Sequence, residues 1–228
     1  MKVFASRLAL ATAMLGAGGL AATSAHADTI TIGLGINGGA ITTEASGSGN
    51  AAFSGSFGGF AVNNVSGTGN PPLSSPVIEN TNSLNVSTSG TGNVLDVYVT
   101  EQGLTTPLGA AVDFLSSFTE NLGGITAGWS VDESTYLDTG NGLFSLTTAL
   151  GSQTYTSGGF NVQSTLANTG AGPYSITAEY VITPHSISGS DNSTINVSVP
   201  EPATFALFGA SLLGCALFLG RRRRSLTL

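Results

Sequence analysis

Acidic and amide side chains gather in one stretch of the chain, and their oxygen atoms are the ligands that hard cations prefer. The residues of this group are Asp132, Glu133, Asp138 and Asn141. Asp191 and Asn192 form a second group in a predicted turn. Neither group matches the full D-x-[DN]-x-[DN]-G calcium loop, and Asp and Asn are also common in turns for backbone reasons. A calcium site at the first group is therefore a hypothesis, and no other cofactor is expected.

Few other residues have the types and spacing that catalysis needs. His185 is the one histidine beyond residue 27, and the sequence contains no G-x-S-x-G motif, which disfavours a Ser-His-Asp arrangement. Residues 33–38 match G-x-G-x-x-G, but no helical pattern follows, which indicates a turn and not a dinucleotide site. Paired carboxylates such as Asp132 and Asp138 leave glycoside hydrolysis open. We expect no catalytic residue, with a secreted hydrolase as an alternative.

The charges divide the chain into a central region and two ends. All thirteen acidic residues except Glu201 lie between 28 and 199, and this region has no Lys or Arg. The six basic residues are Lys2, Arg7, Arg221, Arg222, Arg223 and Arg224. Because proteins bind nucleic acids through Lys and Arg on the phosphates, nucleic acid is excluded as a partner of the central region. The lone Cys215 lies outside this region, so disulfides do not hold it together.

Residues 1–27 have the organisation of a secretory signal peptide. Two basic residues supply its positive start, and residues 8–22 are apolar. Ala25 and Ala27 place small side chains at the two positions that a signal peptidase inspects. We expect cleavage before Asp28 and export across the inner membrane.

The C-terminal end has the organisation of a membrane anchor. Residues 203–220 are apolar, and a helix of this length reaches about 27 Å, close to the roughly 30 Å hydrocarbon core of a bilayer. The four arginines that follow hold that end in the cytoplasm by the positive-inside rule. Pro200 and Pro202 flank Glu201 and keep the tripeptide extended beside the membrane.

The order of Pro-Glu-Pro, apolar span and arginine cluster in residues 200–228 resembles the PEP-CTERM sorting signal of Gram-negative bacteria. The resemblance implies that an exosortase, a membrane peptidase-like transferase, recognises Pro200, Glu201 and Pro202 and removes the tail that carries Arg221 to Arg224. These residues are then substrate features of the sorting enzyme and not catalytic. The resemblance also implies a bacterium that makes exopolysaccharide, and a protein of the cell surface or biofilm matrix.

Alternation of apolar residues with Ser, Thr or Asn predicts β-strands through residues 28–199. The alternation is clearest at residues 29–36, 84–89, 94–100, 160–166, 174–183 and 194–199, and weaker at 51–62, 128–135 and 143–148. Turns rich in Gly, Asn and Pro separate these segments. We therefore predict one all-β domain, an antiparallel sandwich of about eight to ten short strands.

Two segments depart from this alternation. From Pro107 to Leu122, apolar residues recur at helical spacing, which favours a short helix over a pair of strands. Residues 38–59 are rich in Gly, Ser and Ala. They are predicted to form either a mobile loop or a sheet edge that tolerates glycine.

These features predict an exported structural protein of the cell surface or extracellular matrix, held by its C-terminal helix and then processed by an exosortase. Its expected partners are that exosortase, the membrane before processing, and exopolysaccharide or the cell envelope afterwards. The alternative is a calcium- or carbohydrate-binding adhesin module, because hydroxyl and amide groups exchange hydrogen bonds with sugars.

Overall fold

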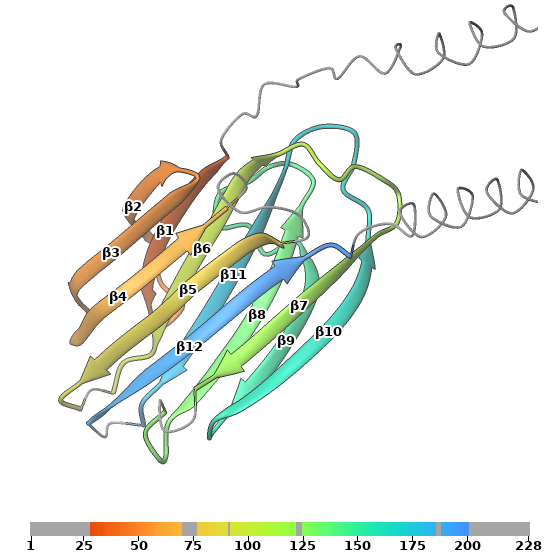
Figure 1. Ribbon diagram of the computed structural model, residues 1–228. Helices are drawn as coiled ribbons and strands as arrows, with labels where there is room; N and C mark the ends of the chain where they lie inside the picture. The colour runs from red at the N-terminus through yellow and green to blue at the C-terminus, as the bar shows by residue number, and fades with distance from the viewer. Residues whose placement is uncertain (1–27, 70–76, 91, 122–124, 186–187, 201–228) are drawn as a thin grey trace, which may run out of the picture.

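The predicted alternation builds two antiparallel sheets in the computed structural model, which describes residues 28–200 apart from 70–76, 91, 122–124 and 186–187 (Figure 1). Sheet A has six strands, in the spatial order β2 (Thr42–Ser48), β1 (Thr29–Ile36), β6 (Leu95–Leu104), β11 (Tyr174–Thr183), β8 (Ser130–Asp138) and β9 (Thr148–Tyr155). Sheet B also has six, in the order β10 (Gly159–Ala167), β7 (Val112–Glu120), β12 (Gly189–Ser198), β5 (Val77–Thr88), β4 (Phe60–Thr68) and β3 (Asn50–Phe57). The predicted antiparallel sandwich is confirmed.

The structure has more strands than the eight to ten predicted, because the glycine-rich stretch 38–59 is itself folded into strands. β2 is one edge of sheet A, and β3 is one edge of sheet B. The prediction of a glycine-tolerant sheet edge is therefore confirmed over that of a loop. Gly47 shows why glycine is needed there, since a Cβ at this position would lie 2.2 Å from the carbonyl oxygen of Asn50.

The helix predicted from Pro107 to Leu122 is wrong, because residues 112–120 form strand β7, which lies between β10 and β12 in sheet B. Inward and outward positions alternate strictly along β7. Two of its inward residues are polar, Ser116 and Glu120. They interrupt the alternation of apolar residues from which the sequence would have indicated a strand. Ser116 is satisfied by a 2.6 Å hydrogen bond to Thr135 of the facing sheet. Tertiary partners thus override the helical spacing.

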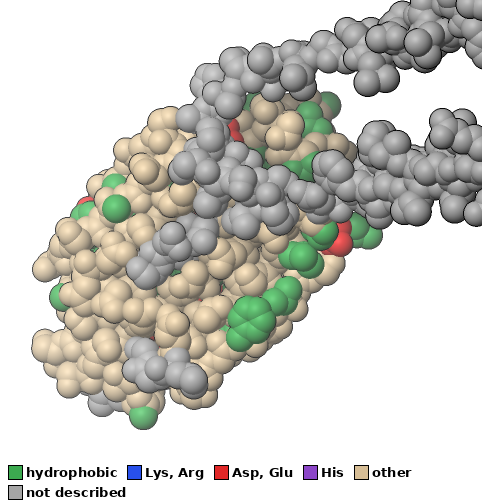
Figure 2. Space-filling model, viewed as in Figure 1, with side chains coloured by type: hydrophobic (Ala, Val, Ile, Leu, Met, Phe, Trp, Pro, Cys, Tyr) green, Lys and Arg blue, Asp and Glu red, His purple; other side chains and the backbone are tan. Residues whose placement is uncertain are grey.

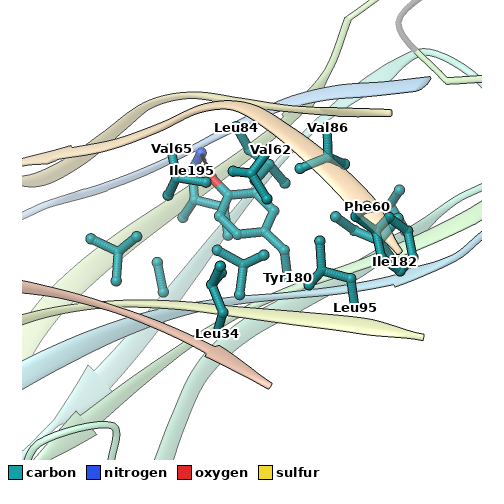
Figure 3. Packing of buried hydrophobic residues seen from close by; sticks show 14 of the residues in the cluster. Leu34, Phe60, Val62, Val65, Leu84, Val86, Leu95, Tyr180, Ile182 and Ile195 are labelled. Carbon is teal, nitrogen blue, oxygen red and sulfur yellow. Dashed lines mark hydrogen bonds between the residues drawn. The ribbon is translucent and has the colours of Figure 1, made fainter. Parts of the chain in front are cut away.

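The middle of the sandwich is a core of aliphatic and aromatic side chains from both sheets (Figure 3). Leu34, Val62 and Tyr180 are at most 1% exposed and pack within one cluster. The Tyr180 hydroxyl accepts a 2.9 Å hydrogen bond from the backbone N–H of Ile195, so its polar group is satisfied inside the core. A second apolar cluster contains Phe114, Leu137 and Tyr174 among its members. Burial of this surface is the main source of stability.

Both ends of the folded region lie at the same end of the sandwich: β1 begins there and β12 ends there (Figure 1). Across the parts of the chain that the structure describes, no helix is long and apolar enough to span a bilayer. The predicted membrane helix, residues 203–220, and the predicted signal peptide, residues 1–27, lie outside the described residues.

Candidate functional site

The structure separates the four predicted calcium ligands into three places. Asp132 and Glu133 are neighbours on β8 and therefore point to opposite faces of sheet A. Glu133 is fully buried in the interior, whereas Asp132 lies on the outer face and accepts a hydrogen bond from the hydroxyl of Thr154.

The other two predicted ligands are used in the turn that follows β8. The carboxylate of Asp138 accepts backbone N–H bonds from Gly140 at 2.8 Å and Gly142 at 3.0 Å. Asn141 accepts a 2.8 Å bond from the N–H of Gly103. Within the described ranges, no three His, Cys, Asp or Glu residues are grouped so that they could hold a metal ion.

Asp191 lies in β12 and not in the predicted turn, and its side chain is fully buried. It meets Glu120 of β7 across Ser193, whose Oγ lies 2.8 Å from Glu120 Oε2 and 3.0 Å from Asp191 Oδ1. A serine hydroxyl carries one proton and can donate to only one of these carboxyls. The other carboxyl must itself donate to Ser193 Oγ, so at least one of the two is protonated.

Glu133 completes this interior acid group from the facing sheet. Its side chain is 0% exposed, and neither carboxylate oxygen has a hydrogen-bond partner. Burial, and secondarily the charge of Glu120, raises the pKa of Glu133 to about 8. Burial likewise raises the pKa of Asp191 well above its ordinary value, with Glu120 adding to the shift. The region from 28 to 199 has no Lys or Arg to neutralise these groups, so protons do so.

A second buried pair of acids lies elsewhere between the sheets. Glu79 of β5 is 1% exposed, and burial followed by the charge of Glu101 raises its pKa well above the ordinary value. Gly69 allows Glu101 to fit, because a Cβ at that position would lie 2.3 Å from Glu101 Oε1. The interior therefore holds carboxyl groups whose pKa values are raised because burial disfavours their charged form.

The outer face of sheet A carries a different constellation, with one carboxyl between two phenols. Glu179 of β11 lies directly opposite Tyr98 of β6 in the sheet register. Hydrogen bonding from Tyr98 and Tyr136 favours the ionised form of Glu179, but burial outweighs it and raises the pKa of this carboxyl. The ring of Phe144, from the turn after β8, lies 5.9 Å from that of Tyr98 and covers one side of the group. Phenols beside a carboxyl have the chemistry that recognises sugar hydroxyls.

His185 lies on the exposed turn after β11 with a left-handed backbone, φ 49°. The glycine motif at residues 33–38 runs from β1 into the β1–β2 hairpin turn, where Asn37 and Gly38 both have positive φ. The interpretation of this motif as a turn is confirmed.

The predicted sorting segment begins where the fold ends. β12 lies between β7 and β5 in sheet B and ends at Ser198. Val199 still packs against the second apolar cluster, and Pro200 is exposed. The remaining predicted sorting and cleavage residues lie outside the described residues; they are Ala25, Ala27, Glu201, Pro202, Arg221, Arg222, Arg223 and Arg224.

Residues 198–224 match the PEP-CTERM protein-sorting motif. The chain therefore carries this sorting motif at its C-terminal end. The motif implies export, a membrane-anchored sorting signal and processing by an exosortase. Its first matched residue is the last residue of β12, so the motif follows the folded domain without an intervening linker. No curated protein matches the chain.

Solved structures similar to this chain are remote in sequence. TmCBM27, a carbohydrate-binding module that recognises mannan, is 13% identical, and the match covers 65% of this chain and 84% of the module with a TM-score of 0.32. The K1 cleaved adhesin domain of Lys-gingipain from Porphyromonas gingivalis W83 is 11% identical, and that match covers 67% and 98% with a TM-score of 0.35.

Sequence reasoning did not identify the interior acid group, although one signal was present. Val131, Glu133 and Leu137 share a parity on β8, so the alternation already placed Glu133 on the face of the apolar residues. The same parity places Glu120 with Phe118 only if residues 112–120 are taken as a strand. No local pattern reveals that Glu120, Glu133 and Asp191 meet, because they come from three strands of two sheets.

Proposed function

We propose that this chain is a non-enzymatic structural protein of the cell surface or extracellular matrix. A signal peptide exports it, its C-terminal segment anchors it, and an exosortase releases the folded domain. The observation that carries this proposal is the position of the motif. It begins at Ser198, where the last strand ends, so cleavage beyond Pro200 removes none of the twelve strands.

The chemistry of the domain supports a role in a hydrated polymer. Its described part has no Lys or Arg, and the outward positions of β12 are Ser, Asn and Thr. These neutral donors and acceptors hydrate well and exchange hydrogen bonds with sugar hydroxyls. Its candidate catalytic groups are dispersed or buried: His185 lies on a turn, and Glu133 is inaccessible to solvent.

The test is intact-mass measurement on fractions of the producing organism, comparing the wild type with a Pro200→Ala/Pro202→Ala variant. We expect the wild-type mass to end near residue 200 and the variant to keep its arginine tail in the membrane fraction. Equal masses, with the tail present in both proteins, would contradict the proposal. A Pro173→Ala variant, altered in a loop of the domain, is the matched control and should be processed normally.

A carbohydrate-binding module is the second candidate function, and the outer face of sheet A favours it. Tyr98, Tyr136 and Glu179 gather hydroxyl and carboxyl groups on this face. Affinity electrophoresis in gels containing the organism's own polysaccharide tests this candidate. Retardation of the wild type that Tyr136→Ala abolishes, and that Tyr155→Phe at the buried Tyr155 leaves intact, would support it. Equal mobility with and without polysaccharide would exclude it for that polymer.

A further inference from the structure

Strand β10 exposes an apolar row on the surface of sheet B. Phe160, Val162 and Leu166 are 68%, 46% and 69% exposed and share the outward parity of the strand. Figure 2 shows apolar side chains along this edge of a face that is otherwise largely uncharged. Apolar side chains with this much exposure mark an interaction surface when they are contiguous.

β10 also lies at the edge of its sheet. Among the described strands it pairs only with β7, so its other side presents backbone groups to a further strand. Natural edge strands are usually protected by lysine, proline or an inward charge. β10, with the sequence GFNVQSTLA, has none of these.

The adjacent edge strand, β9, is protected by side chains of β10 itself. The Gln163 amide donates to the carbonyl of Ser152 at 2.5 Å and accepts from its N–H at 3.2 Å. Thr165 donates to the carbonyl of Leu150 at 2.6 Å. Side-chain amides thus occupy the edge of β9 in the way a neighbouring strand would, whereas the edge of β10 stays open.

The exposed apolar residues of the other described segments do not form such a row. Leu108, Leu143 and Leu146, the other large apolar side chains exposed to this degree in the described chain, lie between strands. Two carboxyl residues of β7 pair with β10: Glu120 is buried between the sheets, and Asp113 accepts a 2.5 Å hydrogen bond from Ser164. An apolar row and an open edge therefore coincide at one strand.

We propose that β10 pairs with β10 of a second copy of this chain, antiparallel and about a two-fold axis at Gln163. A two-fold interface requires a self-complementary surface, and β10 has one. In this register Phe160 lies opposite Leu166 of the second copy, and Val162 lies opposite Ser164. The strand carries no charge that would oppose a like charge across the axis. The pairing extends sheet B across both copies and places the two apolar rows side by side on one face.

The first test is sedimentation of the full chain in detergent, comparing Val162→Lys with Leu146→Lys. Both positions are similarly exposed, at 46% and 42%. Both variants also keep residues 201–228, so any association through that segment affects the two variants equally. Lysine at position 162 places a charge opposite Ser164 of the second copy and diagonal to the lysine of that copy, and we expect the dimer to weaken about tenfold or more. Leu146→Lys should sediment like the wild type. Equal dimerisation of both variants, or a monomeric wild type, overturns the proposal.

The second test fixes the register by disulfide formation in a Cys215→Ser background. Val162→Cys and Ser164→Cys chains, mixed and oxidised, should form a mixed disulfide in high yield, because opposed residues of paired strands meet the distance requirement. Ser54→Cys, exposed on the other edge strand of sheet B, is the control and should not cross-link. Cross-linking through position 54 in place of 162 and 164 overturns the proposal.

Self-association goes beyond the proposed matrix role and is measured on purified protein, so its failure leaves the processing test unaffected. Dissociation of the dimer on addition of the organism's polysaccharide would show that a sugar chain, and not a second copy, is the preferred occupant, and would likewise overturn it.

Discussion

The apolar middle of the sandwich and the interior acid group formed by Glu120, Glu133 and Asp191 are equally buried but are stabilised in opposite ways. In the middle, the hydroxyl of Tyr180 accepts a hydrogen bond from the N–H of Ile195 at 2.9 Å, and the cluster contains no Asp or Glu. In the acid group, Glu133 is 0% exposed and depends on a bound proton to remain neutral. Burial alone therefore does not define a core: one region is insensitive to pH, and the other makes the stability of the fold depend on it.

The pH dependence of unfolding is the largest expected effect. A carboxyl whose pKa is higher in the folded state than in the unfolded chain stabilises the fold fully below the unfolded value. That contribution is lost as the pH rises toward the folded value. For Glu133 this window runs from the ordinary 4.5 to about 8, and the loss is on the order of 5 kcal/mol.

Urea denaturation at pH 4.5, 7 and 9 measures this effect. We expect the free energy of unfolding to fall steadily across the three values. A flat or rising profile would mean that the interior acids are paired or solvated in solution.

Leu34→Ala should produce the next largest effect, and the effect should not depend on pH. Leu34 is 0% exposed in the apolar middle, and removing its side chain costs about 2–5 kcal/mol through lost burial and the cavity that remains. Leu143→Ala, at a residue 43% exposed between strands, is the control and should change stability by less than about 0.5 kcal/mol. If the loss of unfolding free energy caused by Leu34→Ala depended strongly on pH, the two regions would not differ in their response to pH.

Glu133→Gln should reverse sign with pH. The amide cannot ionise, so at pH 9 the variant should be more stable than the wild type by about 4 kcal/mol. Near pH 4, where the wild-type carboxyl is neutral in both states, we expect a small loss of about 1 kcal/mol. Glu44→Gln on edge strand β2 measures the effect of removing one charge outside the group and should leave the pH profile parallel to that of the wild type. The same stability difference at both pH values would contradict our assignment.

Tyr180→Phe should give the smallest effect of the four. It removes the oxygen that accepts the 2.9 Å hydrogen bond from Ile195 but keeps the ring, which costs about 1 to 2 kcal/mol. Calorimetric melting at pH 5 and pH 8 should give nearly the same decrease in melting temperature. A decrease confined to the higher pH would mean that Tyr180 belongs electrostatically to the acid group.

Much of the fold followed from local pattern, and the exceptions share a cause. Residues 29–36 and 174–183 alternate cleanly and form β1 and β11 with the predicted bounds. β7 was predicted as a helix because inward Ser116 and Glu120 interrupt its apolar alternation. The hydrogen-bond partners of these two side chains, Thr135 and Ser193, lie on other strands. Glu120, one of the residues that misled the prediction, is also a member of the interior acid group.

The candidate sites divide in the same way. The sorting motif is a linear signal that could be recognised in the sequence. Pro200, Glu201 and Pro202 are followed by an apolar span and then by arginines. The predicted calcium ligands were close in sequence but are distributed by the alternation of β8 and its turn. Proximity along a strand places neighbours on opposite faces, which is why sequence spacing was a poor guide there.

The sequence by itself determined the all-β architecture and the sorting motif, because side-chain alternation and linear signals are local properties of a chain. Only the tertiary structure decided that acids from β7, β8 and β12 gather in the interior, and that the apolar row of β10 lies on an open edge. Both depend on which strands become neighbours. Strand order is set by the packing of segments that are distant in the sequence, and local sequence patterns do not predict it.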